Sequence, residues 1–496
     1  MPTLRVPLVG SLTNRNVNAA LADTKDQRFV NCFLEIVENK ITGKHDFWLN
    51  KRQGTAASSA VQASATGQYG AIVWTTNSAA VAPAIFSYLK TGGSDMMFFD
   101  SAGTQIGGDV TTTNSCVSME ETDISGTGNL TAIMTDDVSA ALEAWFFPEG
   151  GAWTQITDAQ FPASITPAHA HMDGYMFVMT EAGALWNSDL NSLSAWTAGA
   201  FISANSFGDN GVGCAKYRNM IVGFGDASCE FFYNAGNASG SVLNRIDNAT
   251  LRIGAVRNTA GRGTAIRGLL NNVYWIGNNS DTGSRGIYRF NGMQAEKISN
   301  SAIDKLVSNG VIRSIVGSFS LLGMSHVAFS SGGASVWCYC VDNGFWWWLT
   351  PAGPLTITAM LGTVDSSAYS KSYFSTVTNA FVYTFNPNSP VWQDNATAYT
   401  MTVQTDGVDG DTSENKTWDR FTLVGDTQST TCPVSVSFSD DDGANYSTAR
   451  DIDMGTTQTW LTDLGESTRR SWRLANASNT SCRIKRADIE YTRGAH

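Results

Sequence analysis

Two of the five histidines in the chain, His169 and His171, stand two residues apart. On a β-strand such residues point to the same face, so their imidazoles could bind one metal ion together. Asp173 follows closely, but no third ligand lies at a recognisable spacing. We therefore expect structural, hydrogen-bonded histidines at this position.

The stretch SDDDGANY near the C-terminus resembles the Asp-box turn of sialidases and related propellers. In such a turn a carboxylate such as Asp441 accepts backbone N–H bonds, Gly443 supplies a positive φ, and an aromatic ring packs beneath. The alternative is a calcium loop through Asp440, Asp442 and Asn445. The distal bidentate glutamate of calcium loops is missing, so we expect a structural turn.

Acidic residues that could serve glycoside hydrolysis are Glu120 and Glu121, Asp136 and Asp137, and Glu143. That chemistry depends on the separation of two carboxyl groups in space, which sequence spacing does not determine. The chain has no HExxH, no GxSxG, no phosphate loop and no GxGxxG that opens a helix. We predict that it is not an enzyme, with no catalytic, cofactor-binding or metal-binding residues and no cofactor.

The aromatic run Phe345, Trp346, Trp347 and Trp348 could form a carbohydrate platform. On a strand, Trp346 and Trp348 face one way and Trp347 the other. We expect core packing between repeats. The alternative is one exposed member at a subunit or ligand surface.

The composition is that of a β-rich protein with a large core. Hydrophobic residues make up 42% of the 496 residues, charged residues only 15%, and 47 glycines accompany 11 prolines. The net charge of −12 argues against a protein that binds nucleic acid by neutralising phosphates. Arginines cluster at positions 245–267 and, with Lys485, at 469–486; we expect salt-bridge partners there, and the alternative is a surface facing phosphates or an acidic partner.

The eight cysteines are scattered, without a CxxC pair or a Cys/His group at zinc spacing. Cys338 and Cys340 would share one face of a strand as small core residues. The N-terminal residues lack the pattern of a signal peptide, and no apolar run approaches ~18 residues. We expect reduced thiols in a chain that is made and folded in the cytoplasm without a membrane anchor.

A unit of two or three short strands recurs through the middle of the chain, with Gly, Asp, Asn or Ser at its turns. The copies are spaced by roughly 40 to 55 residues, which is the size of a four-stranded propeller blade. Tandem β-sandwiches would need modules of about 100 residues, which are not visible. We therefore predict an all-β chain with a β-propeller of six or seven blades. Its units are centred near Ile72, Ile133, Phe177, Val222, Tyr274, Val327 and Phe374.

The chain divides into three predicted parts: an N-terminal docking segment (1–66), the propeller (67–390) and a C-terminal β-sandwich (391–496) with period-two alternation. The Ala/Ser-rich run 55–66 is expected to be a linker or a loop that leads into the first blade.

The stretch SNSAIDKLVSNG, residues 299–310, breaks the strand pattern and predicts a short helix between two blades. Ser301 and Asp304 stand where a capping box would place them, and Gly310 marks the end. Its apolar face would consist of Ile303, Leu306 and Val307.

Residues 28–35, RFVNCFLE, and then Lys51–Thr55, KRQGT, resemble the opening of the packaged-DNA stabilisation (tail hub) proteins of podoviruses. Members of that family have R-x-V-N-x-x-x-E followed by an R-P-G turn, and this chain has Gln53 in place of the proline. Further similarity lies in residues 225–232, 275–307 and 438–490.

The resemblance implies a virion protein of the phage tail, a hub or nozzle. Six copies would form a ring below the portal and adaptor proteins, retain packaged DNA, form its exit channel and anchor fibres, spikes or a plug. Double-stranded DNA would pass through without sequence-specific binding, because an acidic lumen repels it. The alternative function is a phage glycan-binding or glycan-degrading, sialidase-like propeller, suggested by the Asp-box-like turn and the 15 tryptophans.

Overall fold

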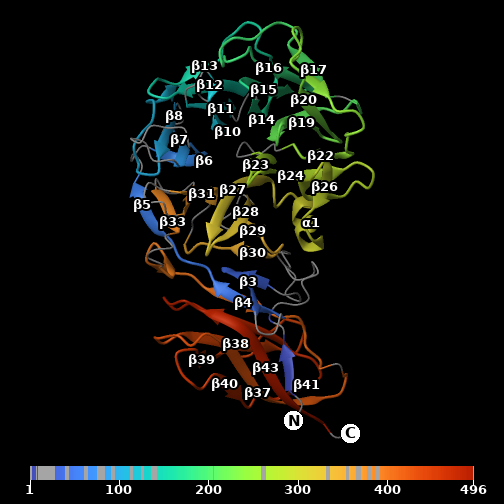
Figure 1. Ribbon diagram of the computed structural model, residues 1–496. Coiled ribbons are helices and arrows are strands. Elements are labelled where there is room, and N and C mark those ends of the chain that lie inside the picture. Colours follow the sequence, from blue (N-terminus) through green and yellow to red (C-terminus); the bar gives the residue numbers. More distant parts are fainter. Residues whose placement is uncertain are drawn as a thin grey trace.

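The protein is described from a computed structural model. The structure describes residues 3–6, 8, 28–39, 44–60, 65–74, 84–90, 95–111, 115–124, 128–135, 142–204, 206–257, 264–330, 336–353, 357–364, 370–376, 381–385, 391–410 and 412–494. Figure 1 shows an elongated molecule with a ring of small sheets at one end and a two-layered β-structure, which holds both termini, at the other.

The ring is a β-propeller, as predicted. Among the described residues it contains seven four-stranded units, each a meander of antiparallel strands. The first three units are β6 (Ala65–Val73), β7 (Ala84–Lys90), β8 (Asp95–Asp100) and β9 (Val110–Thr111); β10 (Ser115–Thr122), β11 (Asn129–Thr135), β12 (Leu142–Pro148) and β13 (Thr154–Gln155); and β14 (Ile165–Met172), β15 (Tyr175–Thr180), β16 (Ala184–Asn187) and β17 (Phe201–Ser203).

The next three units are β18 (Gly211–Tyr217), β19 (Met220–Gly225), β20 (Cys229–Asn234) and β21 (Leu243–Arg245); β23 (Ile266–Leu269), β24 (Asn272–Asn279), β25 (Arg285–Asn291) and β26 (Gln294–Lys297); and β27 (Ser314–Leu321), β28 (Met324–Ser330), β29 (Val336–Cys340) and β30 (Trp346–Leu349). In the fifth unit a short strand, β22 (Ile253–Ala255), also pairs with β24.

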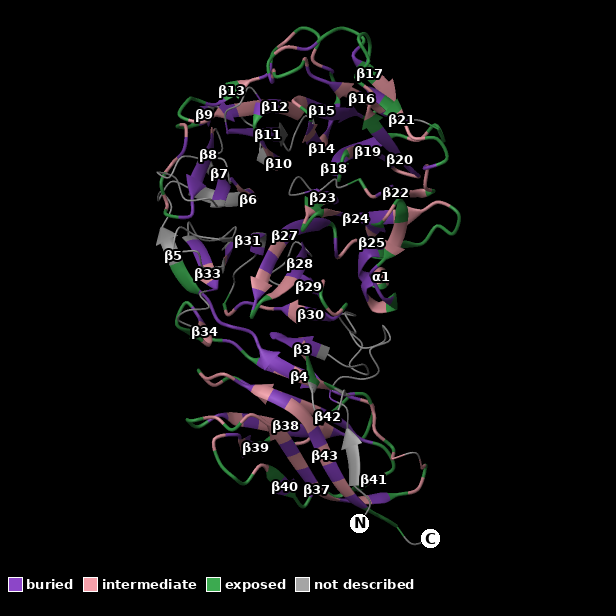
Figure 2. Cartoon of the chain, viewed as in Figure 1, coloured by how far each residue is buried: buried purple, intermediate pink, exposed green. Residues whose placement is uncertain are grey.

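The last unit consists of β31 (Ile357–Val364), β32 (Ser370–Thr376), β33 (Phe381–Phe385) and β5 (Ala56–Ala60). The innermost strand of each blade contacts that of the next, and β31 contacts β6, so the ring closes. Of the seven predicted centres, six lie on the second strand of their blade and Ile72 lies on the first. Those second strands are almost wholly buried, because both faces of an inner propeller strand pack against neighbouring blades (Figure 2).

The expectation of a linker at residues 55–66 is wrong in part. Residues Ala56–Ala60 form β5, which pairs antiparallel with β33 and supplies the outer strand of the seventh blade. A run of alanine and serine carries no period-two hydrophobic signal, and Ala56 and Ala57 are exposed. The strand therefore depends on backbone hydrogen bonds to the free edge of β33, which only the closed ring provides.

The second part of the molecule is a sandwich of two sheets. One contains β3 (Cys32–Asn39), β4 (Lys44–Lys51), β43 (Arg483–Arg493), β37 (Lys416–Gly425) and β40 (Trp460–Thr462), with β1 (Thr3–Val6) on β43 and β41 (Glu466–Ser467) on β37. The other contains β39 (Arg450–Asp453), β38 (Pro433–Ser439), β42 (Ser471–Asn476), β36 (Met401–Gln404) and β2 (Arg28–Val30). Trp472 joins the layers, with ring centroids 4.5 Å from Phe421 and 6.3 Å from Trp418.

Strand β2 connects the two parts. It pairs antiparallel with β36 of the sandwich and in parallel with β30 of the sixth blade. The N-terminal segment therefore adds β1 to β4 to the sandwich and β5 to the propeller. A short hairpin of β34 (Gln393–Asp394) and β35 (Thr397–Ala398) lies at the same junction. The boundaries at residues 66 and 390 stay a prediction.

The predicted helix is present as α1 (Ser301–Ser308), with Ile303, Leu306 and Val307 buried and Gly310 at a φ of 67°. Its N-cap is Asn300 rather than Ser301, since the Asn300 side chain accepts from the N–H groups of Ala302 and Ile303. An asparagine caps a helix as well as a serine does, so the sequence allowed either position.

We predict that β5 is needed to close the ring. Replacing Ala56 and Ala57 together by proline should lower Tm and increase proteolysis of the seventh blade. One of any two successive strand residues directs its N–H to the partner strand, and proline has no N–H to donate, which costs roughly 1–3 kcal/mol. The matched variant with serine at both positions keeps the N–H groups. Thermal unfolding and limited proteolysis measure the effect; equal behaviour of the two variants would contradict it.

Candidate functional site

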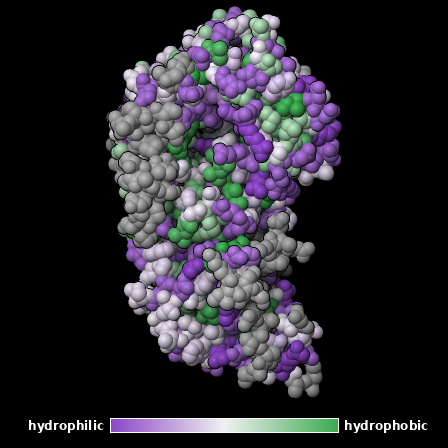
Figure 3. Space-filling view, in the orientation of Figure 1, coloured by the Kyte–Doolittle hydropathy of each residue, from purple (hydrophilic) through white to green (hydrophobic). Residues whose placement is uncertain are grey.

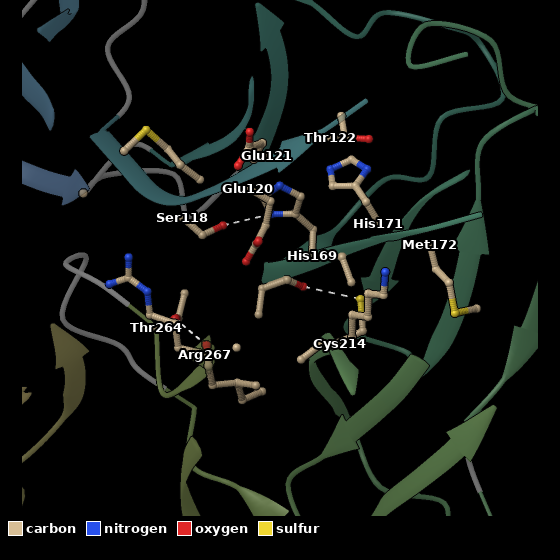
Figure 4. Close-up of a pocket in the computed structure, with 18 of the residues that line it drawn as sticks. Ser118, Glu120, Glu121, Thr122, His169, His171, Met172, Cys214, Thr264 and Arg267 are labelled. Carbon is tan, nitrogen blue, oxygen red and sulfur yellow. Dashed lines mark hydrogen bonds between the residues drawn. The ribbon is translucent and has the colours of Figure 1, made fainter. Parts of the chain in front are cut away.

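The axis of the propeller holds a pocket of about 270 Å³. Its wall is built from the innermost strands β6, β10, β14, β18 and β23, with Ile315 of β27. The propeller is hollowed near its centre in Figure 3, and Figure 4 shows the side chains that line the pocket. Two groups singled out from the sequence, the histidine pair and the Glu120–Glu121 pair, both lie here.

His169 and His171 project from the same face of β14, as predicted, and meet one hydroxyl group. Thr131 Oγ1 lies 2.8 Å from Nε2 of His169 and 2.8 Å from Nε2 of His171. Ser118 Oγ donates to the Pro167 carbonyl, lies 3.0 Å from Nδ1 of His169 and can accept a hydrogen bond from it. Thr131 Oγ1 also lies 3.2 Å from the Glu120 carbonyl oxygen. Because a hydroxyl group has one proton, at least one of the two imidazoles must donate to it, and His171 Nδ1 has no hydrogen-bond partner among the described residues.

Burial lowers the pKa of His169 to about 3 and holds that of His171 well below its usual range, with His169 and Lys216 adding to the effect on His171. Three of the four ring nitrogens are engaged in the network, and Asp173 turns away to accept from Asn234 Nδ2 at 2.9 Å. Within the described residues, no three His, Cys, Asp or Glu side chains converge as a metal site. The arrangement fits structural histidines.

Arg267 crosses the axis of the propeller. From β23 its guanidinium donates to the carbonyl of Val316 in the sixth blade, at 3.1 Å, and to that of Ala71 in the first. Arg267 also lines a second cavity, beside Met360 of the seventh blade, and Glu120 lines both cavities. Arg267 thus ties three blades together and occupies the space along the axis.

Glu120 faces this axial space from β10. Burial raises the pKa of its carboxyl to about 7; Arg267 opposes the shift and Glu121 adds to it. The side chain is half-buried by exposed area and lines both axial cavities, where the neighbouring blades reduce its hydration. Glu120 and Glu121 are successive strand residues and leave opposite faces of β10, so they are not a facing pair. Glu143 accepts from Trp145 Nε1 at 3.2 Å, and Asp136 and Asp137 lie outside the described residues.

A second constellation lies between the propeller and the sandwich. Arg52 and Asp394, each with 1% of its side chain exposed, form a bidentate ion pair with N–O distances of 2.9 and 2.5 Å. Arg52 also donates to Asn31 Oδ1 at 2.8 Å, and its guanidinium lies 3.8 Å from the ring centroid of Tyr399. Asp394 in turn accepts from Thr55 Oγ1 and from the backbone N–H of Ala352, which follows β30 of the sixth blade.

Backbone geometry completes this junction. Asn31 adopts a φ of 55° and donates its N–H to the Trp348 carbonyl of β30 at 2.7 Å. A Cβ on Gly54 would come within 2.2 Å of the Gln393 carbonyl oxygen, so only glycine fits. Asn31, Arg52 and Gly54 all belong to the N-terminal motifs singled out in the sequence. Their partner Asp394 was not predicted, because it is 342 residues from Arg52 and carries no local signal.

The Asp-box-like turn is structural, as predicted. Asp441 accepts from the Asn445 N–H at 2.8 Å and from the side chains of Ser439 and Asn445, each at 2.7 Å. These three hydrogen bonds lower the pKa of Asp441 to about 2. Gly443 has a φ of 84°. Asp440 pairs with Arg470 and Asp442 with Arg469.

The tryptophan run packs in the core. Trp346 and Trp347 are buried, and Trp348 stacks on Trp337 with ring centroids 4.5 Å apart. Trp347 points to the other face of β30 from Trp346, and its ring contacts those of Phe33 and Phe319.

Most of the clustered arginines have acidic partners, as expected for salt bridges. The ion pairs are Arg245 with Glu230, Arg252 with Asp281, Arg257 with Glu181, Arg483 with Glu35 and Asp426, Lys485 with Asp46, and Arg486 with Asp488. Arg262 lies outside the described residues. In the described part of the chain no helix is long and apolar enough to cross a membrane.

Residues 22–312, more than half of the chain, match the phage stabilisation family, described as bacteriophage P22 Gp10, β-propeller. The chain belongs to this family. It is therefore a bacteriophage structural protein, a component of the virion. No curated protein matches it. A crystal structure of BBS1N in complex with ARL6DN contains a chain similar to it, with 10% identity over 68% of this chain and 99% of that one, at a TM-score of 0.38.

We predict that the Arg52–Asp394 pair contributes strongly to the stability of the folded chain. Asp394→Asn should lower stability by about 3–5 kcal/mol, because it leaves a guanidinium buried without its counter-charge. Arg252→Gln, which breaks an exposed pair with Asp281, is the matched control and should cost under about 1 kcal/mol. Urea unfolding followed by tryptophan fluorescence measures both. Similar losses in the two variants would contradict the prediction.

The buried histidines should make the protein acid-labile. The folded pKa of His169 is about 3, so between pH 6.5 and 3 the unfolded chain binds more protons and stability falls as pH falls. The loss should reach roughly 2 kcal/mol at pH 5 for this residue. His169→Gln removes that titration and should flatten the decline of Tm between pH 7 and 5. The exposed histidine His45 provides the control, and His45→Gln should follow the wild type.

Glu120 should change the stability of the protein with pH in the direction opposite to His169. Its folded pKa of about 7 exceeds the usual value, so stability falls as pH rises from about 4.5 to 7. Glu120→Gln mimics the protonated form and should be more stable than the wild type by roughly 1–2 kcal/mol at pH 8, and equal to it at pH 4.5. Tm measured at both pH values tests this; no pH-dependent difference would count against it.

Proposed function

We propose that the protein is the tail hub or nozzle of a short-tailed phage, which forms a ring below the portal and adaptor proteins. The observation that carries the proposal is the match of residues 22–312 to the phage stabilisation family. The match includes the N-terminal motif and most of the propeller. In this role the protein retains packaged DNA and forms its exit channel.

The motif residues support a structural role. Asn31, Arg52 and Gly54 make no open site; their side chains and backbone hold the propeller and the sandwich together. A subunit that bears load between the head and the tail needs its two parts to move as one body. A rigid buried junction meets that need.

The DNA path is proposed to run between subunits rather than through a propeller. The pocket at the axis has a volume of about 270 Å³, and Arg267 is bonded across the axis to two other blades. Duplex DNA, about 20 Å wide, does not fit there. A ring of six copies leaves a central lumen outside each propeller, and a subunit charge of −12 disfavours adhesion of phosphates to its wall.

The partners follow from this placement. We propose that the virion tail contains the ring, assembled in the host cytoplasm, with contacts to the portal or adaptor ring on one side and to fibres, spikes or a plug on the other. The N-terminal segment and the sandwich lie together at one end of the molecule and are the proposed docking parts (Figure 1). We propose no enzymatic activity.

The glycan-binding or glycan-degrading alternative has less support. The Asp-box-like turn lies in the sandwich instead of a blade, and its carboxylates Asp440 and Asp442 are paired with arginines. Trp346 and Trp347 are buried rather than presented to a sugar.

The proposed role is tested in the virion. Symmetry-resolved imaging and mass spectrometry of purified particles should find the chain as a ring in the tail. Particles that lack it should package DNA and then release it to nuclease. Wild type and Arg252→Gln should restore DNA retention on complementation, and Asp394→Asn should not. Particles that retain DNA without the chain, or a tail without it, would overturn the proposal. Release of reducing sugar from host polysaccharide by the purified chain would favour the alternative.

A further inference from the structure

Two cysteines lie where the two sheets of the sandwich meet. Cys432 comes immediately before β38 and Cys482 immediately before β43, so each belongs to the start of a strand in a different sheet. Both are buried, at 0% and 2% exposure. A bond between their sulfurs would join the two layers covalently.

The contacts bring the two thiols together. Cys432 Sγ donates to the carbonyl oxygen of Ser481, the residue before Cys482, at 3.4 Å, and each of the two thiols shifts the pKa of the other. Asn476 Nδ2 donates to Cys432 Sγ at 3.5 Å, and Ser478 Oγ approaches it at 3.9 Å. Polar groups therefore gather on one of the two sulfurs.

From this arrangement we propose that Cys432 and Cys482 are a reversible dithiol–disulfide pair, whose oxidation clasps the two sheets of the sandwich.

A buried lysine favours the reactive form of the pair. Lys51 is 1% exposed and donates to Asn476 Oδ1 at 2.8 Å and to the Ser478 carbonyl at 2.6 Å. The hydrogen bond from Cys482 lowers the pKa of the Cys432 thiol, and Thr480, Ser478 and the positive charge of Lys51 contribute further. The same hydrogen bond raises the pKa of Cys482. One attacking thiolate and one resolving thiol are what disulfide exchange requires.

The other described cysteines provide an internal contrast. The Cys214 thiol donates to the carbonyl groups of Ala168 and Phe177, and burial raises its pKa. Cys229 is likewise buried with a raised pKa. The proposed pair lies beside a surface loop: Ser478 contacts Cys432, and its neighbours Ala477 and Asn479 are exposed. Movement of that loop would admit a small oxidant.

The oxidant is a small-molecule disulfide such as glutathione disulfide. The Cys432 thiolate attacks one of its sulfurs, the S–S bond breaks, and one thiolate leaves with the electron pair and takes up a proton. Cys482 then loses its proton and attacks the Cys432 sulfur, which expels the second thiol. The protein loses two protons and two electrons, and the oxidant takes them up to become two thiols.

The full chain, purified under reduction, would be incubated with glutathione disulfide, quenched in acid, alkylated after unfolding, and mapped by peptide mass spectrometry. We expect one cross-linked peptide pair containing Cys432 and Cys482, 2 Da lighter than its reduced parts, and six alkylated thiols. Oxidation should raise Tm by roughly 5 °C, because the bond closes a long loop, and a reductant should reverse the shift.

Cys214→Ser is the matched control and should form the same cross-link with the same shift. Cys432→Ser should leave Cys482 fully alkylated and abolish the shift. Eight alkylated thiols in the oxidised wild type, or glutathione left on Cys432 without conversion, would overturn the proposal. A cross-link between Lys51 and one of the two cysteines through an added oxygen would also overturn the proposal. Its peptide pair would be 14 Da heavier than the reduced parts.

Discussion

The buried ion pair between Arg52 and Asp394 is the interaction on which the architecture depends. Removing two charges from water costs several kcal/mol each, and the cost is met only where every lone pair and proton finds a partner. Here the guanidinium meets a carboxylate, Asn31, two carbonyls and the ring of Tyr399. These partners come from the N-terminal segment, the sixth blade and the sandwich, so the charges are satisfied only when all three are in place.

The course of the N-terminal segment follows from that junction. Strand β2 sits between β30 and β36, β3 and β4 enter the sandwich sheet, Arg52 pairs with Asp394, and β5 then closes the seventh blade. One short stretch of chain thus links ring closure to the sandwich. A propeller closed by its own first and last strands would lack this link. The coupling is a physical basis for treating the molecule as a single body in an assembly.

The axis of the propeller shows a different strategy. Neutral histidines, a hydroxyl group and a carboxyl with a raised pKa fill the space between blades two and three, while Arg267 reaches across to blades one and six. The histidines and Arg267 are held by partners from other blades. The axis therefore strengthens the ring and is closed to a thick polymer. Its acid and base groups oppose each other in pH dependence, because burial disfavours the charged form of both.

The sequence by itself determined the all-β class, the repeating blade, the helix α1 and the turn at Asp441, because these depend on local patterns: alternation, turn residues, caps and positive φ. It also placed His169 and His171 on one face and marked Asn31, Arg52 and Gly54 as a motif. Only the tertiary structure decided that β5 is a strand, that Asp394 is the partner of Arg52, that Arg267 spans the axis, and that Cys432 meets Cys482. These depend on contacts between residues far apart in the chain. Ala56–Ala60 has no apolar period of its own, and a carboxylate 342 residues from its arginine carries no local mark. Such contacts exist only once the ring and the sandwich have closed around them.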